Sequence, residues 1–397
     1  MKDKEIERLI KLEEKRQNGV INLIASENYV SRDVLMALGS VFTNKYSEGY
    51  PGKRYYGGNE IVDKVENLAK ERALKLFGLS KNKWSVNVQP YSGSPANLAI
   101  YLALVPIGQK IMGMSLSMGG HLTHGHKVSA TGKLWKWIHF GVSKKTELLD
   151  YYEIRRIARC EKPKMIVAGF TAYPRVIDFK KLRKICDEVG AIFMVDMSHF
   201  AGLVAGGAYP SPFPHADVVM TTTHKTLCGP RAAIIFSRKI KLHASSFMLH
   251  DLIDRAVFPG LQGGPHINQI AAIAVCLKEA ATPAFKKYAK QVVKNAKVLA
   301  KELQKKGWRI VSGGTDSHLF LVDTWARGIS GKTAQELLEA EKIIVNKNTI
   351  PFDTRSPFDP SGIRIGTAAV TTQGMKEKDM IKIAQKIDKI LKSHGGH

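Results

Sequence analysis

The sequence predicts an α/β fold in which helices cover both faces of a mainly parallel β-sheet, followed by a smaller C-terminal α+β lobe. Two observations predict it. Short apolar segments alternate with amphipathic ones over the first two thirds of the chain, and long amphipathic segments dominate after residue 265. Short, continuously apolar strands are typical of parallel sheets buried on both faces. With 397 residues, 44% of them hydrophobic, the chain can form two or more lobes.

Hydrophobic periodicity and helix start and stop signals place the expected elements. In the first lobe we expect helices at 59–77, 94–104 and 178–189, and strands at 85–88, 164–169, 191–196, 216–221 and 232–236. In the second lobe we expect helices at 266–281, 284–306, 332–341 and 376–392, with strands at 308–312, 318–323 and 361–366. We therefore divide the chain into an N-terminal arm (1–47), a large domain (48–278) and a small C-terminal domain (279–397).

Residues 2–17 indicate a polar helix with apolar positions Ile6, Leu9, Ile10 and Leu12. A helix of this length is not stable in water by itself, so it must pack on something, and another subunit is one candidate. The N-terminal segment has no apolar core, and no apolar run in the chain approaches the roughly 18 residues of a membrane span. We expect a soluble, cytoplasmic protein that has no membrane partner.

Four scattered cysteines without a Cys-x-x-Cys pair argue against zinc and against a disulfide framework, and no metal site is expected. The net charge of +25 makes a nucleic-acid partner worth considering. The basic residues are spread along the chain, however, and no zinc-finger or RNP-type pattern accompanies them. We therefore keep nucleic acid as a secondary partner only.

Lys225 and Asp196 each follow an apolar strand, where ligands bind in α/β sheets. A buried lysine has a lowered proton affinity and becomes a good nucleophile toward a carbonyl group, although its segment alone favours a surface lysine in a threonine-rich loop. Asp196 alone reads as a helix cap. Together they fit a carboxylate held against a pyridine nitrogen and a lysine that binds the same cofactor. This spacing is typical of the aspartate-aminotransferase-like (fold-type I) pyridoxal-phosphate enzymes.

Three further segments carry polar groups that suit such a site. Ser92, Gly93 and Ser94 stand between a strand and a helix start, where free backbone amides form an anion cup or an ordinary capped turn. His121 lies in a glycine-rich loop, where a ring stacked on a planar cofactor is a better interpretation than zinc. Arg364 lies between apolar neighbours, so that it would need a substrate carboxylate or an internal salt bridge as partner.

Taken together, these segments resemble the serine hydroxymethyltransferase family, in its shorter prokaryotic form. The resemblance runs from about residue 22 to residue 368, and its motifs occur in the family's order. The segments that carry it are 25–28, 46–58, 119–125, 196–199, 221–230, 259–265 and 361–367. Departures from the usual pattern are Tyr91 for histidine, Pro95 for glutamine, Cys228 for arginine and Ala232–Ala233 for two glycines.

The resemblance implies a homodimer with shared active sites. Its implied catalytic residues are Lys225, Glu48, His121, Asp196 and Thr222. Its implied pyridoxal-phosphate contacts are Ser92, Gly93, Ser94, His121, Thr171, Asp196, His199 and Lys225, with Gly263 and Gly264 from the partner. The implied amino-acid contacts are Ser26, Tyr46, Glu48, Tyr56 and Arg364, of which Glu48 and Tyr56 come from the partner, and the implied folate contacts are Leu116, Gly120 and Asn348.

The implied reaction is the reversible transfer of the hydroxymethyl carbon of serine to tetrahydrofolate, which gives glycine and 5,10-methylenetetrahydrofolate. Lys225 would hold the cofactor covalently, Asp196 would pair with the pyridine nitrogen, and Glu48 would manage the proton of the serine hydroxyl. The alternative is a folate-independent aldolase acting on 3-hydroxy amino acids. That enzyme would share Lys225, Asp196 and Arg364 but would not need Glu48 or Asn348.

Overall fold

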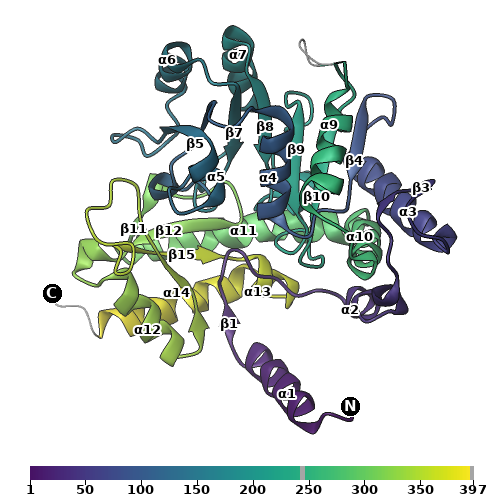
Figure 1. Cartoon of the computed structure of the whole chain (residues 1–397). Coiled ribbons are helices and arrows are strands. Elements are labelled where there is room, and N and C mark those ends of the chain that lie inside the picture. The colour runs from purple at the N-terminus through teal and green to yellow at the C-terminus, as the bar shows by residue number, and fades with distance from the viewer. Residues whose placement is uncertain (242–245, 394–397) are drawn as a thin grey trace.

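The computed structural model describes residues 1–241 and 246–393. Its main feature is a seven-stranded sheet in the order β4-β10-β9-β8-β7-β5-β6 (Figure 1). These strands are β4 (Trp84–Asn87), β10 (Ala233–Arg238), β9 (Val218–Thr222), β8 (Ile192–Asp196), β7 (Met165–Gly169), β5 (Lys110–Met114) and β6 (Lys136–Phe140). All pairings are parallel except those that β10 makes with β4 and β9. The prediction of a mainly parallel sheet is confirmed.

Helices cover both faces of this sheet because successive strand residues point to opposite sides. On one face, Phe193 and Val195 pack in a cluster with α2 (Arg32–Leu38), α3 (Glu60–Leu76), α7 (Phe179–Val189) and α10 (Ile267–Ala280). On the other face, Met194 packs with α4 (Gly93–Leu104) and α9 (Leu249–Arg255). The alternation along one strand therefore builds two apolar cores.

A second, antiparallel sheet follows in the order β11-β12-β15-β14, with β11 (Arg309–Ile310), β12 (Leu319–Asp323), β15 (Gly362–Gly366) and β14 (Asn346–Asn348). Its core includes side chains from α11 (Pro283–Lys305), α12 (Gly331–Ala340) and α14 (Glu377–Lys392). Helix α11 contributes Val292 to the first large cluster and Leu299 to this one. A single helix thus ties the two cores together, and the exact boundary between domains stays a prediction.

Several elements were not predicted or were predicted with wrong bounds. The elements without a prediction are β5, β6, α2, α6 (Tyr151–Glu161), α9 and β14, together with the short helices α5 (Ala130–Leu134), α8 (Ala201–Ala205) and α13 (Ala368–Thr372) and the strands β2 (Gly49–Tyr50) and β3 (Lys53–Arg54). The predicted strand 308–312 is wrong beyond Ile310, because Ser312 turns into the left-handed region with a φ of 56°. The amide of Ser312 donates to the carboxylate of Glu147 there, at 2.6 Å.

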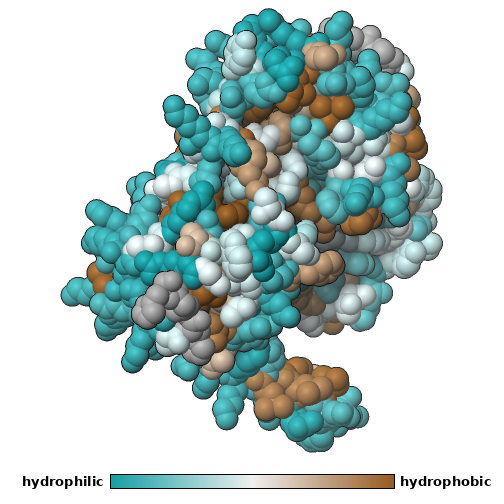
Figure 2. Space-filling model, turned by 90° about the vertical axis from the view of Figure 1, so that its left-hand side faces the viewer, coloured by the Kyte–Doolittle hydropathy of each residue, from teal (hydrophilic) through white to brown (hydrophobic). Residues whose placement is uncertain are grey.

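Helix α1 (Lys4–Asn18) confirms the predicted N-terminal helix and projects from the rest of the chain (Figure 1). It has no buried residue, and Ile6, Leu9, Ile10 and Leu12 are each 45–49% exposed. Figure 2 shows apolar side chains gathered on this projecting helix. The strand that follows it, β1 (Ile21–Asn22), pairs in parallel with β13 (Ile343–Ile344). Among the described residues, no helix combines the length and the apolar character needed to cross a membrane.

Candidate active site

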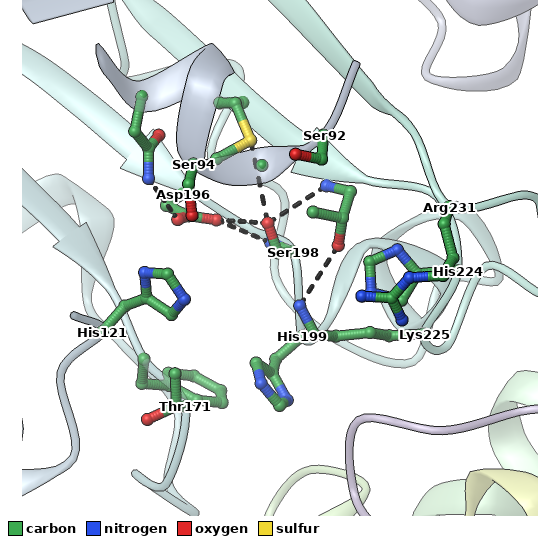
Figure 3. A pocket seen from close by; sticks show the side chains of 15 residues that line it. Ser92, Ser94, His121, Thr171, Asp196, Ser198, His199, His224, Lys225 and Arg231 are labelled. Atoms are coloured by element: carbon green, nitrogen blue, oxygen red, sulfur yellow. Dashed lines mark hydrogen bonds between the residues drawn. The ribbon is translucent and has the colours of Figure 1, made fainter. Parts of the chain in front are cut away.

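A cavity of about 170 Å³ opens at the carboxyl ends of β7, β8 and β9, beside the first turn of α4. Parallel strands bring their carboxyl ends to the same edge of a sheet, so residues far apart in sequence meet there. Figure 3 shows His121, Thr171, Asp196, His199 and Lys225 around one common space. The lining residues are Ser92, Gly93, Ser94, Asn97, His121, Phe170, Thr171, Asp196, Ser198, His199, Met220, Thr222, His224, Lys225 and Arg231.

Lys225 follows β9 by three residues and is 9% exposed. Its Nζ donates to Oγ1 of Thr222 at 3.2 Å, and no carboxylate of the described residues forms a salt bridge with it. Burial lowers the pKa of Lys225 to about 8, against a smaller opposing effect from Asp196. Near pH 8 a large part of the Lys225 amine is therefore neutral, as a nucleophilic amine requires.

The carboxylate of Asp196, at the end of β8, is buried and hydrogen-bonded on both oxygens. Its Oδ1 accepts from the amide of Ser198 at 3.0 Å and from its hydroxyl at 2.5 Å. Its Oδ2 accepts from Nδ2 of Asn97 at 3.0 Å and lies 3.3 Å from Nε2 of His124. Burial alone would raise the pKa of Asp196, but these hydrogen bonds, led by that of His124, hold it below its usual range. Asp196 is thus a buried carboxylate that stays ionised.

His121 is linked to the same network. The amide of Thr123 donates to Nδ1 of His121 at 3.1 Å, and the Thr123 hydroxyl lies 2.7 Å from the same atom. Burial, with the nearby His124, lowers the pKa of His121 to about 4. The ring is therefore neutral at pH 7, and because Nδ1 accepts, its proton lies on Nε2. Such a ring can stack on a planar molecule without adding charge.

Glycine is needed at position 93 because α4 starts very close to the end of β9. A Cβ at Gly93 would lie 2.6 Å from Cγ2 of Thr222, which no real packing allows. The side chain of Ser92, the N-cap residue, makes no hydrogen bond to the helix, so the first backbone amides of α4 have no side-chain cap where Ser92, Gly93 and Ser94 line the cavity. Free amides at the start of a 12-residue helix suit an anion.

Arg364 lies on β15 of the second sheet and is 9% exposed. Its guanidinium donates to Oδ1 of Asn346 at 3.0 Å, to the backbone carbonyl of Thr171 at 2.7 Å and to Oγ of Ser26 at 3.4 Å. Burial lowers the pKa of Arg364 to about 10. No acidic side chain among the described residues forms a salt bridge with it, so the internal salt bridge considered from the sequence is wrong. A buried guanidinium without an acid is suited to bind a carboxylate from outside.

Five of the predicted site residues lie together in this chain but away from the Lys225 cavity. The hydroxyl of Tyr46 donates to Oε1 of Glu48 at 3.3 Å, and the rings of Tyr46 and Tyr56 meet at 4.9 Å. A Cβ at Gly263 would lie 3.2 Å from Oε1 of Glu48, and one at Gly264 would lie 3.4 Å from the Tyr46 ring. None of the five lines the cavity. We refer to these residues as the Glu48 cluster.

The remaining predicted residues occupy the surroundings. The backbone carbonyl of Gly120 accepts from the Thr171 hydroxyl at 2.7 Å, and Leu116 lies in the short helical turn η2 (Leu116–Met118). Asn348 lies on β14, and its Nδ2 donates to the carbonyl of Thr349 at 2.6 Å. None of Leu116, Gly120 and Asn348 is among the residues that line the cavity.

Five residues in or beside the cavity had no predicted role: Asn97, Ser198, His224, Arg231 and His318. Asn97 stands four residues after Gly93 on α4, and that spacing was a usable signal because such residues share a helix face. Ser198 follows Asp196 by two residues, as in a common side-chain-to-amide turn. Nothing in the sequence near position 318 indicated that its Nε2 lies 3.3 Å from Nδ1 of His199.

Comparison with known proteins agrees with this geometry. Residues 1–387 match the family described as serine hydroxymethyltransferase. The serine hydroxymethyltransferase of Koribacter versatilis (strain Ellin345) is 56% identical over 381 residues, which is 96% of this chain and 87% of that protein. The one of Desulfotalea psychrophila (strain LSv54 / DSM 12343) is 54% identical over 389 residues, 98% of this chain and 88% of that protein. The chain therefore belongs to the serine hydroxymethyltransferase family: it is a pyridoxal-phosphate-dependent enzyme whose co-substrate is tetrahydrofolate.

Proposed function

We propose that the Lys225 cavity is where this enzyme binds pyridoxal phosphate and cleaves serine, within a fold of the aspartate-aminotransferase-like type I. The observation that carries the proposal is a buried lysine whose pKa is lowered to about 8, opposite the buried carboxylate of Asp196. The residues fit the cofactor at both ends: Asp196 suits a protonated pyridine nitrogen, and the start of α4 suits a phosphate.

Each polar side chain then has a separate task. Lys225 would hold the cofactor covalently through its amine, which loses its proton at a lowered pKa, and Thr222 would orient its nitrogen. Ser92, Gly93 and Ser94 would hold the phosphate, and the neutral ring of His121 would contact the face of the cofactor ring. When bound, the cofactor supplies a ring that withdraws the electron pair left on the substrate Cα.

His199 and Thr171 complete the cofactor site in this proposal. His199 is buried, and burial together with Lys225 lowers its pKa strongly, so that it would serve as a neutral hydrogen-bonding group for the phenolic oxygen of pyridoxal phosphate. The backbone carbonyl of Thr171 accepts a hydrogen bond from the guanidinium of Arg364 at 2.7 Å. The hydroxyl of Thr171 donates to the backbone carbonyl of Gly120. Thr171 therefore fixes the substrate-binding arginine relative to the cofactor site.

Arg364 binds the carboxylate of serine, with Ser26 beside it at 3.4 Å from Nη2. A planar guanidinium that is already held on three sides presents its donors in a fixed direction. Fixing the carboxylate also fixes the rotation of the amino acid about its Cα–N bond, which decides the bond that breaks. Leu116, Gly120 and Asn348 line the tetrahydrofolate site.

We also propose that the protein is a homodimer in which the Glu48 cluster completes the site of the second copy. The support is that these residues lie together on one chain without lining its own cavity. Tyr46 and Tyr56 then contact the amino acid, Gly263 and Gly264 contact the phosphate, and Glu48 holds or accepts the proton of the serine hydroxyl. The exposed apolar side of α1 is consistent with a partner surface. A cytoplasmic location and a secondary nucleic-acid contact remain predictions.

The test of the cofactor site is covalent retention. The wild-type protein is loaded with pyridoxal phosphate, reduced with borohydride and unfolded, and the bound cofactor is counted. We expect one cofactor per chain for wild type and none for Lys225→Ala, while Lys181→Ala, which replaces an exposed lysine, retains it fully. Retention by Lys225→Ala would overturn the assignment. Serine cleavage that does not respond to tetrahydrofolate would favour the aldolase alternative.

A further inference from the structure

Tyr91 connects two parts of the chain that the proposed function assigns to two different active sites. It directly precedes Ser92, the first residue of the phosphate cup on its own chain. Its hydroxyl donates to the backbone carbonyl of Gly264 at 2.8 Å. Its ring stacks on that of His266 at 4.1 Å between centroids and 5° between planes. One side chain thus fixes both the carbonyl of Gly264 and the residue that caps α10.

The backbone next to Tyr91 is tied to the same loop. The amide of Tyr91 donates to Oε1 of Gln262 at 3.0 Å, and Nε2 of Gln262 donates to the carbonyl of Gln89 at 2.9 Å. Gln262 is 9% exposed, so both ends of its amide are used inside the protein. The loop at 262–266 is therefore attached to the segment 89–91 by three hydrogen bonds and one ring contact.

The other side of this loop faces the Glu48 cluster. Gly263 and Gly264 have no side chains to hold them. A Cβ at Gly263 would be in tight contact with the Glu48 carboxylate at 3.2 Å, and one at Gly264 would be in ordinary contact with the Tyr46 ring at 3.4 Å. The side chain of Gln89 also donates to the carbonyl of Gly49, directly after Glu48, at 2.9 Å. Without the hydroxyl of Tyr91, the carbonyl of Gly264 would lose the one side-chain donor that the described contacts give it.

We propose that Tyr91 is a positioning residue that holds the Gly263–Gly264 loop in the shape in which it serves the active site of a second copy of this chain. The inference rests on the proposed function, since it requires that Gly263 and Gly264 serve the neighbouring site. It goes further in assigning a role to a residue that departs from the family pattern. Tyr91 also directly precedes Ser92, which belongs to the proposed phosphate site of the same chain. It therefore lies between the cofactor site of its own chain and the loop that serves the cofactor site of the partner.

Mixed dimers separate the two directions in which Tyr91 can act. Lys225→Ala removes covalent cofactor retention from its own site, so that only one site per mixed dimer is counted after borohydride reduction. In the first dimer, Tyr91→Phe and Lys225→Ala are on one chain and the other chain is wild type. The counted site then receives its loop from the chain that carries Tyr91→Phe. In the second dimer the two substitutions are on different chains, and the counted site receives an unaltered loop.

The readout is the pyridoxal phosphate concentration that half-saturates covalent retention. We expect it to rise about fivefold in the first dimer, the factor that one hydrogen bond of ordinary strength supports, and to change less than twofold in the second. The control is Tyr209→Phe in place of Tyr91→Phe, because the Tyr209 hydroxyl also donates to a backbone carbonyl, that of Arg175 at 3.1 Å, in the core. The control should leave half-saturation unchanged in both dimers.

The opposite pattern, with the second dimer affected and the first unchanged, would show that Tyr91 acts only on its own cup and would overturn the inference. Equal effects in both dimers, no effect in either, or an effect of Tyr209→Phe would also overturn it. Sedimentation velocity of the unmixed wild-type protein is measured first. A fully active monomer there would overturn the shared active site itself, and the inference with it, which separates that failure from the others.

Discussion

The amine of Lys225 lies 3.2 Å from the hydroxyl of Thr222, and no carboxylate in the described part of the chain forms a salt bridge with it. The lysine lies three residues past the end of β9, and its hydrogen bond to Thr222 brings its amine back to the last residue of that strand, at the cavity. Burial without a paired carboxylate disfavours the charged form, which is why the pKa of Lys225 falls to about 8. The buried amine of Lys225 therefore lowers the free energy of unfolding whenever it is protonated.

This cost predicts a pH dependence for the cofactor-free protein. Below about pH 8, Lys225 is protonated in both the folded and the unfolded state, and the folded state bears the full cost of the buried charge. Between pH 8 and pH 10.5 only the unfolded state keeps the proton, so this cost disappears as the pH rises. Lys225→Met should therefore be more stable than wild type at pH 7 by on the order of 3 kcal/mol, with the difference shrinking above about pH 8.

The measurement is urea unfolding of both cofactor-free proteins from about pH 7 to about pH 10.5, the range over which the proton is lost. Taking the difference between the two proteins removes the contribution of other titrating groups. A difference that is constant over this range, or that grows with pH, would contradict the lowered pKa of Lys225.

Gly93→Ala should reduce both stability and cofactor affinity. The added Cβ would lie 2.6 Å from Cγ2 of Thr222, and such overpacking costs about 1–3 kcal/mol. Thr222→Ser removes that methyl group and keeps the hydroxyl that contacts Lys225, so the double variant should regain most of the loss. Unfolding free energies and cofactor titrations of the four proteins form a double-mutant cycle.

Gly39→Ala is the matched control for this cycle. Its added Cβ would have its nearest neighbour at 3.6 Å, in ordinary van der Waals contact. It should change stability by no more than about 0.5 kcal/mol. A Gly93→Ala variant as stable as Gly39→Ala would show that the approach of α4 to β9 is not as close as described.

Arg364→Ala should raise the KM for serine and also slow turnover. Loss of a bidentate contact to a carboxylate in a buried site costs about 2–5 kcal/mol. Arg364→Lys keeps the charge but loses the planar fork, and we expect a KM between those of wild type and the alanine variant. Steady-state kinetics with serine measure both effects.

The control for Arg364 is Arg327→Lys. Arg327 also donates to backbone carbonyls, those of Lys306 and Gly307, but lies in the second lobe away from the cavity. Its KM for serine should stay at the wild-type value. A change of less than about threefold in Arg364→Ala, roughly 0.6 kcal/mol, would mean that Arg364 is not the carboxylate anchor.

Helix α1 gives the test of dimer formation. Replacing Ile6 and Ile10 by glutamate would place two charges on the apolar side of a helix whose stability depends on packing against something else. We expect Ile6→Glu/Ile10→Glu to raise the dimer dissociation constant at least tenfold in sedimentation equilibrium, and activity to fall on dilution. Glu14→Gln, a change on the same exposed helix, should leave both unchanged. A dissociation constant equal to that of wild type in the double variant would exclude α1 from the interface.

The sequence by itself determined the elements whose patterns are local. The amphipathic run at 59–77 became α3, and the apolar runs near 165, 192 and 218 became three neighbouring strands of the parallel sheet. Lys225 and Asp196 could be singled out because strand ends in such sheets face ligands. β5 was missed because Lys110 and Gly113 interrupt its short apolar run, although four of its five residues are buried. β6 was missed because it is an edge strand in which only Phe140 is buried, so its sequence has no continuous apolar run.

Only the tertiary structure decided which distant groups meet. Arg364, on a strand of the second sheet, donates to the carbonyl of Thr171, which follows a strand of the first sheet. Its other partners are Asn346 and Ser26, and no acidic side chain of the described residues forms a salt bridge with it. The collision that a Cβ at Gly93 would have with Thr222 joins residues 129 positions apart in the sequence. The periodicity of a sequence indicates which side of a helix or strand is apolar. The distances between side chains, their pKa values and their partners depend on tertiary packing, because packing brings together residues that are far apart in the sequence and removes water from them.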